Sequence, residues 1–239
     1  GNTGAGKSAT MLVVLAGILR CRDVKTRLVD GKGGVELGVF EGQAEMFAET
    51  SQQGLALLLE TAEEVKRRYA KLRRIQNEIK QRIRAGEDID IPSDLPVTDE
   101  DKAIVVVLDE VVQFIAALSS KKPSEGGPSD RTLAEEAIRL IGNQGRSARV
   151  HLIAGTQRPS AKALDTDGWR ANFGAVIGGR CRTMDDLRVI LGPSHGFEPD
   201  VLEEIEDDIR GQKFMGEAFD RDVLELAGIE NANCFAAVT

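Results

Sequence analysis

The chain has 239 residues, of which 41% are hydrophobic and 29% are charged, and this composition is typical of one globular domain with a sizeable core. Its three cysteines, an odd number without C-x-x-C spacing, and its two histidines argue against a disulfide framework, a zinc site and secretion, and indicate a reducing compartment. The formal net charge of −8 argues against a uniformly basic nucleic-acid-binding surface, and no apolar run reaches the roughly 18 residues of a membrane-spanning helix.

The sequence opens on residues 1–8 (GNTGAGKS), which match the phosphate-loop pattern G-x-x-x-x-G-K-[ST] at every fixed position. Glycines permit the positive-φ turns of such a loop, Lys7 can reach the β- and γ-phosphates, and Ser8 can hold Mg²⁺. The helix that follows points its positive end at the anion. The alternative interpretation is a glycine-rich turn before an ordinary helix. We predict that ATP and Mg²⁺ are bound by Gly1, Asn2, Thr3, Gly4, Ala5, Gly6, Lys7, Ser8 and Ala9.

The segments after this loop predict a helix and a strand. Residues 9–19 are apolar and lack proline, which predicts the buried helix that follows a phosphate loop. Residues 27–30 indicate a short strand, and the glycine-rich residues 31–34 end it. Because a strand should directly precede a phosphate loop and the sequence begins at Gly1, we expect a fragment of a longer chain that lacks this strand.

Residues 55–84 have helical spacing and predict one long helix or a hairpin of two helices. A dense basic sector lies within them, formed by Lys66, Arg67, Arg68, Lys71, Arg73, Arg74, Lys80, Arg82 and Arg84. A solvated face that pairs with acidic neighbours such as Glu64 is the simplest interpretation, and a subunit contact or a nucleic-acid contact is the alternative. Residues 85–101 carry glycine, proline and acidic residues and indicate an exposed connector. We expect residues 55–101 to form a helical insertion and connector within the domain.

The run at residues 104–110 (IVVVLDE) predicts a central parallel strand, buried on both faces, that ends in two carboxylates. Such a strand delivers its last side chains to the carboxyl edge of the sheet, where ligands bind in open α/β folds. We expect Asp109 to hold the water shell of Mg²⁺ opposite Ser8, and Glu110 to orient or deprotonate the water that attacks the γ-phosphate. An ordinary strand before an acidic helix start is the alternative for this pair by itself.

The remaining segments complete the predicted sheet. The low-complexity residues 119–130 predict a mobile loop, and the apolar stripe of residues 133–141 predicts a helix. Residues 150–156 (VHLIAGT) predict a third parallel strand, and Gln157 follows it directly, so we predict Gln157 as a catalytic sensor of the γ-phosphate or its water. Residues 234–238 indicate a late strand. Together the segments predict an α/β fold with a central, mostly parallel sheet flanked by helices.

Several segments occur in the order seen in the FtsK/SpoIIIE family of double-stranded DNA translocases. They are the phosphate loop, residues 27–37 (RLVDGKGGVEL), residues 107–110 (VLDE), residues 145–160 (GRSARVHLIAGTQRPS) and residues 171–173 (ANF). The TQRPS segment at residues 156–160, more than the phosphate loop, separates this family from other P-loop ATPases. The chain therefore resembles the FtsK/SpoIIIE family from Gly1 to about Gly192.

The resemblance implies a RecA-like P-loop NTPase motor domain over residues 1–239. In this family such domains assemble as a hexameric ring around duplex DNA and move it by ATP hydrolysis. Arg146 matches the family arginine that reaches the ATP of the neighbouring subunit, where a guanidinium can neutralise charge that builds on the γ-phosphate. A surface arginine at a helix end is the alternative interpretation of Arg146.

The resemblance also implies which residues contact DNA. Arg158 and Arg170 match basic positions of one family pore loop, and Arg188 matches a basic position of a second loop. Met184 stands where that second loop usually carries a lysine, and the nearby Lys162 and Arg182 are charges that can substitute for it. Such residues would follow the phosphates without reading bases, as movement on any sequence requires.

The resemblance leaves two functions open. The first is an ATP-hydrolysing motor that translocates double-stranded DNA through a hexameric ring, in chromosome segregation or in conjugative or mobile-element transfer. The second is a secretion-type relative that binds a protein substrate and acts as an assembly or regulatory module. Either function places the domain in the cytoplasm, or at the cytoplasmic face of the cell membrane if an anchor lies upstream of this sequence.

Overall fold

The computed structural model describes residues 7–124, 126–156, 175–178 and 234–238 of the chain. Within these residues, the strands form one six-stranded sheet in the order β2-β1-β3-β4-β6-β5, and every adjacent pair is parallel. The strands are β1 (Val24–Asp30), β2 (Met46–Ala48), β3 (Ala103–Asp109), β4 (Val150–Thr156), β5 (Ala175–Gly178) and β6 (Cys234–Val238). Parallel strands need crossover connections, which helices usually provide.

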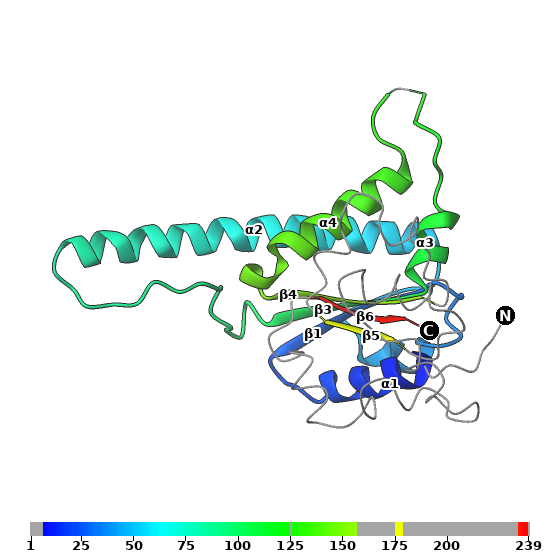
Figure 1. Ribbon diagram of the computed structural model, residues 1–239, viewed down its shortest axis with the longest axis horizontal. Coiled ribbons are helices and arrows are strands. Elements are labelled where there is room, and N and C mark those ends of the chain that lie inside the picture. Colours follow the sequence, from blue (N-terminus) through cyan, green and yellow to red (C-terminus); the bar gives the residue numbers. More distant parts are fainter. Residues whose placement is uncertain (1–6, 125, 157–174, 179–233, 239) are drawn as a thin grey trace, which may run out of the picture.

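Helices cover both faces of this sheet and give the domain three layers (Figure 1). The helices are α1 (Lys7–Ile18), the short 3₁₀ helix η1 (Gly38–Gln43), α2 (Ser51–Arg84), α3 (Val111–Ala117) and α4 (Asp130–Ala148). In Figure 1, α1 lies against one face, and α2, α3 and α4 lie against the other. The predicted α/β fold, a mostly parallel sheet flanked by helices, is therefore confirmed.

Each face of the sheet has its own hydrophobic core, which explains the continuous apolar run in β3. Side chains alternate between the two faces of a strand. Ile104, Val106 and Leu108 join the core under α2, α3 and α4. Val105 and Val107 join the second core, which α1 covers. Because both faces are buried, both sets of positions are apolar along residues 104–108, and the only polar residue of β3 is Asp109 at its carboxyl end.

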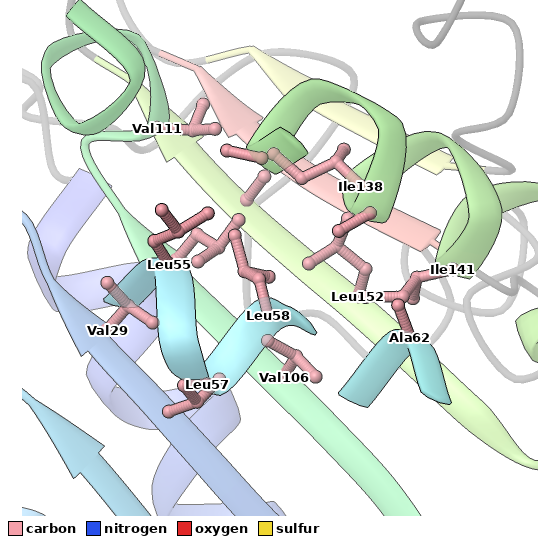
Figure 2. Packing of buried hydrophobic residues seen from close by; sticks show 14 of the residues in the cluster. Val29, Leu55, Leu57, Leu58, Ala62, Val106, Val111, Ile138, Ile141 and Leu152 are labelled. Carbon is pink, nitrogen blue, oxygen red and sulfur yellow. The ribbon is translucent and has the colours of Figure 1, made fainter. Parts of the chain in front are cut away.

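The helix α2 is continuous over 34 residues, so the single helix is confirmed and the hairpin is wrong. It begins at Ser51 rather than at residue 55, because Thr50 and Gln53 form a capping box. The Thr50 hydroxyl accepts a hydrogen bond of 3.2 Å from the Gln53 backbone, and the Gln53 side chain accepts one of 3.1 Å from the Thr50 backbone. The first half of α2 packs into the core, where Figure 2 shows Leu58, and the second half extends past the sheet in Figure 1.

The basic sector of α2 is not uniformly solvated. Arg67 is half-exposed and pairs with Glu64 at 2.7 Å, as predicted for a solvated face. Arg68 is only 2% exposed and pairs with Glu64 at 2.6 Å. It also donates hydrogen bonds to the carbonyls of Lys102 at 2.9 Å and Ala148 at 3.3 Å. The solvated interpretation is therefore wrong for Arg68, which ties α2 to the start of β3 and the end of α4.

The contacts with Arg67 and Arg68 also change the pKa of Glu64. Hydrogen bonds from Arg67 and Arg68 outweigh partial burial and lower the pKa of Glu64 to about 2.

The connector at residues 85–101 contains no helix or strand, as predicted, but it is not exposed throughout. Leu95 is 1% exposed, and its N–H donates a hydrogen bond of 2.8 Å to the Ser147 carbonyl. Asp101 is 2% exposed and pairs with Arg67 and Lys71 of α2.

Several element bounds differ from the sequence-based ones. α4 begins at Asp130 rather than at residue 133, because the Ser129 hydroxyl accepts a hydrogen bond of 3.2 Å from the Thr132 backbone and caps the helix. β1 begins at Val24, three residues earlier than predicted, whereas β4 and β6 have the predicted bounds. β2, β5, η1 and α3 were not predicted. The described part of residues 119–129 contains no helix or strand.

In the part of the chain that the structure describes, no helix is long and apolar enough to cross a bilayer.

Two helical glycines offer a matched test of this packing. A Cβ on Gly54 of α2 would lie 2.6 Å from Phe114 Cε2 and 2.8 Å from Val29 Cγ1, whereas a Cβ on Gly17 of α1 would meet nothing within 4 Å. We expect Gly54→Ala to lower the free energy of unfolding by about 1–3 kcal/mol through overpacking. Gly17→Ala should leave it unchanged or raise it by up to about 1 kcal/mol. Urea denaturation measures both, and equal values would contradict close packing of α2 on β1 and α3.

Candidate nucleotide-binding site

Three neighbouring strands, β1, β3 and β4, end at the same carboxyl edge of the sheet, at Asp30, Asp109 and Thr156. α1 begins at this edge with Lys7, whose ammonium forms an ion pair with Oδ1 of Asp109. Both residues are buried, with exposures of 3% for Lys7 and 1% for Asp109. The structure therefore brings together the lysine of the phosphate loop and the carboxylate predicted for the Mg²⁺ site.

Two glycines allow these groups to approach one another. A Cβ on Gly155 of β4 would lie 2.6 Å from Met11 Sδ and 3.5 Å from Lys7 Nζ. A Cβ on Gly31, directly after β1, would lie 2.6 Å from the carbonyl oxygen of Asp109, to which the Gly31 N–H donates a hydrogen bond of 3.3 Å. A larger side chain at either position would push α1 away from β4 or the loop after β1 away from β3.

Asp109 has a second oxygen that this ion pair does not use. In the described residues, the buried Oδ2 of Asp109 has no hydrogen-bond partner. Burial raises the pKa of Asp109 above its usual value, and the nearby Lys7 opposes that rise. A cation beside Oδ2 would satisfy this oxygen, so the residues fit the predicted Mg²⁺. Among the described residues no three His, Cys, Asp or Glu side chains form a metal cage, and nucleotide-bound Mg²⁺ normally relies on phosphates and water instead.

Glu110 turns back from the end of β3 toward β4. Its backbone has φ 55° and ψ 54°, the left-handed conformation, which is strained for a residue with a side chain and is common at functional sites. Its side chain is buried, with 4% exposure, and its Oε1 accepts a hydrogen bond of 2.9 Å from the Thr156 hydroxyl. The turn thus brings the predicted catalytic carboxylate to the carboxyl end of β4, directly before the position of Gln157.

The loop after β1 adds residues that the sequence pattern did not single out. Ser8 donates a hydrogen bond to Oε2 of Glu36, and Lys32 pairs with Oε1 of the same carboxylate. The Asp30 carboxylate accepts hydrogen bonds of 2.8–2.9 Å from three backbone N–H groups, those of Lys32, Glu36 and Leu37. Burial alone would raise the pKa of Glu36, but hydrogen bonds from Lys32 and Ser8 outweigh it and lower the pKa below its usual value.

One signal in the sequence could have identified Asp30. It ends a strand at the same level as Asp109, its partner in the strand register, so both reach the carboxyl edge. Thr156 likewise ends β4, although only the next residue, Gln157, was predicted to belong to the site. Glu36 lies in a loop without periodicity, and no spacing rule points to it.

Other predicted site residues lie elsewhere. Arg146 is exposed in the last turn of α4, just before β4 begins, so it lies at the amino edge of the sheet, opposite the edge that carries Lys7. Residues 1–6 and the side chain of Ala9 lie outside the described residues. Also outside are the predicted sensor and DNA contacts, Gln157, Arg158, Lys162, Arg170 and Arg188.

Comparison with known proteins identifies the family. The profile of the FtsK/SpoIIIE family matches residues 1–161, which is more than half of the chain. The chain belongs to the FtsK/SpoIIIE family. The matched range includes Lys7, Ser8, Asp109 and Glu110, so the residues that meet at the carboxyl edge lie in the part shared with this family.

Two curated relatives illustrate the degree of similarity. The chain is 32% identical over 209 residues to DNA translocase FtsK of Lactiplantibacillus plantarum, and 28% identical over 204 residues to DNA translocase SpoIIIE of Bacillus subtilis. These matches cover 83% and 80% of this chain. They cover only 24% and 23% of the relatives, so the chain spans about a quarter of their length.

Two solved structures share the fold. The conjugation coupling protein TcpA of pCW3, a monomer with ATPγS, matches with a TM-score of 0.60 and 25% identity, over 80% of this chain and 50% of TcpA. The cytoplasmic domain of the type VII secretion ATPase EccC of Thermomonospora curvata matches with a TM-score of 0.52 and 25% identity, over 80% of this chain and 21% of EccC. The RecA-like P-loop fold expected from the sequence is therefore confirmed.

The hydrogen bond between Thr156 and Glu110 generates a stability prediction. Thr156→Val preserves the shape of the side chain but leaves a buried carboxylate without this hydroxyl donor. We expect the free energy of unfolding to fall by about 1–3 kcal/mol. Thr156→Ser keeps the hydroxyl and should cost less. Chemical denaturation at neutral pH compares the two variants, and a valine variant as stable as the wild type would show that this bond does not hold Glu110.

Proposed function

We propose that the chain is the ATPase motor domain of a translocase that moves double-stranded DNA through a hexameric ring. One observation carries this proposal: Lys7, Asp109 and Glu110 converge at the carboxyl edge of a parallel sheet, in a chain of the FtsK/SpoIIIE family. The names of the curated relatives, DNA translocase FtsK and DNA translocase SpoIIIE, support DNA as the substrate. The process is chromosome segregation or conjugative or mobile-element transfer.

Residues 1–9 bind the phosphates of ATP in this proposal. Lys7 reaches the edge between the ends of β3 and β4, where its ammonium can neutralise the β- and γ-phosphates. Ser8 and Oδ2 of Asp109 hold Mg²⁺ and its water. When bound, Mg²⁺ withdraws charge from the phosphate oxygens and so favours attack at the γ-phosphate.

Glu110 is the residue that acts on the attacking water. A buried carboxylate that is fixed by a neighbouring hydroxyl can orient this water and accept its proton. Thr156 is a positioning residue, because it contacts Glu110 rather than the reacting atoms. Gln157 follows Thr156 in the sequence, and we assign it contact with the γ-phosphate or with its water.

Arg146 acts on the ATP of the neighbouring subunit. Its place at the amino edge of the sheet, opposite the edge of Lys7, supports action between subunits rather than within one. A guanidinium supplied in this way stabilises the charge that develops on the transferred phosphoryl group. Each nucleotide site is therefore complete only in the ring.

DNA lies along basic residues of the pore in this proposal. The DNA phosphates are contacted, without reading of bases, by Arg158 and Arg170 in one loop and by the further charges Lys162 and Arg188. Such contacts suit movement along any sequence. The domain works in the cytoplasm, or at the cytoplasmic face of the membrane where an upstream anchor holds it.

A second candidate function is a secretion-type module that binds a protein substrate and regulates assembly. The similarity to the cytoplasmic domain of the secretion ATPase EccC favours this candidate. Glu110 with its Thr156 contact favours hydrolysis in either case. The two functions differ in whether DNA stimulates the hydrolysis of ATP.

The motor function predicts ATP hydrolysis that duplex DNA stimulates. In the full-length protein, we expect Lys7→Ala to abolish hydrolysis because the phosphates lose their cation. Glu110→Gln should retain nucleotide binding and lower hydrolysis by roughly 100-fold or more, because the water loses its base. Measurement of phosphate release, with and without duplex DNA, checks both effects.

The same assay separates the two candidate functions. A double variant, Arg158→Ala with Arg170→Ala, should lose both salt-sensitive DNA binding and the stimulation by DNA. Lys102→Ala, at a half-buried residue directly before β3 and therefore at the opposite edge of the sheet, serves as the control for loss of positive charge. Hydrolysis that ignores duplex DNA, in a protein that hydrolyses ATP, would contradict the motor and favour the secretion-type module.

The placement of Arg146 predicts complementation between subunits. Arg146→Ala protein and Lys7→Ala protein should each be inactive as pure rings. A mixture should regain part of the activity, because an Arg146→Ala site receives an intact arginine from a Lys7→Ala neighbour. Phosphate release measured across mixing ratios tests this. Absence of recovery in mixed rings of normal size would contradict action between subunits.

A further inference from the structure

The loop between β1 and η1, residues 31–37, is anchored at both ends and contacts the first turn of α1. At its start, the Asp30 carboxylate accepts hydrogen bonds from three backbone N–H groups of the loop. At its end, Leu37 is 1% exposed and packs in the core that α1 covers. Because α1 begins directly after the phosphate loop, this anchoring fixes the position of Glu36 relative to Ser8.

The direction of the hydrogen bond at Ser8 matters for a cation. A serine hydroxyl has one proton and two lone pairs. The proton of Ser8 is donated to Oε2 of Glu36, so the lone pairs of its oxygen point elsewhere. A hydroxyl that ligates a metal ion must offer a lone pair, and one whose proton pointed into the site would oppose the cation.

Glu36 is itself held in place. Lys32 pairs with Oε1 of Glu36, the oxygen that Ser8 does not use. The side chains of Lys32 and Glu36 are 22% and 21% exposed, so this pair is only partly solvated. The result is a chain of contacts, from Lys32 to Glu36 to Ser8, in which each oxygen of the carboxylate has one donor.

The geometry points to Glu36 as a positioning residue for Mg²⁺, which acts by holding the Ser8 proton so that the Ser8 oxygen offers its lone pairs to the cation. Lys32 keeps Glu36 in this orientation. This inference rests on the proposed function, because it takes Ser8 as the Mg²⁺ ligand of a nucleotide site. Partners that orient a metal ligand in this way commonly change metal affinity by roughly 10- to 100-fold when they are removed.

The experiment measures nucleotide binding as a function of Mg²⁺, without relying on hydrolysis. Full-length protein is titrated with MgCl₂ in the presence of fluorescently labelled ATPγS, and the binding of this nucleotide in EDTA is measured separately. Glu36→Ala should raise the half-saturating Mg²⁺ concentration by roughly 10- to 100-fold and leave binding in EDTA unchanged. Lys32→Ala should raise it less. Glu41→Ala, an exposed carboxylate on η1, is the matched control and should change neither value.

Two further variants separate orientation from charge and from folding. Glu36→Gln keeps an acceptor oxygen for Ser8 and should stay close to the wild type; behaviour like Glu36→Ala would overturn the orientation argument. Adding Glu36→Ala to Ser8→Ala should cause no further loss, because the two residues act as one unit. Additive losses would overturn the inference. Thermal unfolding checks that each variant is folded. If Glu36→Ala does not fold, Lys32→Ala provides the test, and an unchanged Mg²⁺ midpoint in Lys32→Ala would then overturn the inference.

The outcomes also separate this inference from the proposed function. Nucleotide binding by the wild type with an unchanged Mg²⁺ midpoint in Glu36→Ala would overturn the role of Glu36 and leave the proposed function standing. A lower midpoint in Glu36→Ala would overturn it as well, since Glu36 would then compete with Mg²⁺ for Ser8. A wild-type protein that binds no ATPγS at any Mg²⁺ concentration would overturn the proposed function and this inference together.

Discussion

The buried ion pair between Lys7 and Asp109 joins the start of α1 to the end of β3, and the other groups of the site are arranged around it. Removal of two charges from water costs several kcal/mol per ion, so each charge is tolerated here only because the other compensates it. Gly155 provides the space for this contact, since a side chain there would collide with Met11 and crowd Lys7. Around this pair, Ser8 faces the loop after β1, and Glu110 turns toward β4.

Among the described residues, the carboxyl edge gathers more acidic groups than basic ones, and each carboxylate is stabilised in a different way. The partners are three backbone N–H groups for Asp30, Lys32 and Ser8 for Glu36, Lys7 for Asp109, and Thr156 for Glu110. An edge of this charge repels a polyphosphate unless cations intervene. ATP binding would therefore require both Lys7 and Mg²⁺. Because Ser8 is the proposed ligand of Mg²⁺, the orientation of its hydroxyl would affect ATP binding directly.

The sequence predicted the parts of the fold that have strong periodicity or a dense motif. The strand at residues 150–156 was predicted to the residue, because its apolar run is bounded by polar residues, and the convergence of Lys7 with Asp109 followed from motif order. The three-residue β2 is too short to give a pattern, and the start of α2 depends on a capping box that the apolar spacing does not show. Helical spacing assigned Arg68 to a basic face but could not show that two backbone carbonyls would bury it. The contact between Glu36 and Ser8 could be found only from the folded loop, because the loop has no periodic pattern.

The amino edge of the sheet is held by contacts of α2 and of the connector after it. Arg68 of α2 donates to the carbonyl of Ala148, and the connector accepts a hydrogen bond of 3.3 Å from Arg149 at the Leu95 carbonyl. These contacts fix the last turn of α4, which carries Arg146. Gly54, at the other end of the packed half of α2, lies against β1 and α3 near the nucleotide edge. From residue 54 to residue 68 an α-helix spans roughly 20 Å. In the proposed ring, α2 therefore contacts both the strand that ends beside the Lys7 site and the last turn of α4, which carries the arginine offered to the neighbouring subunit.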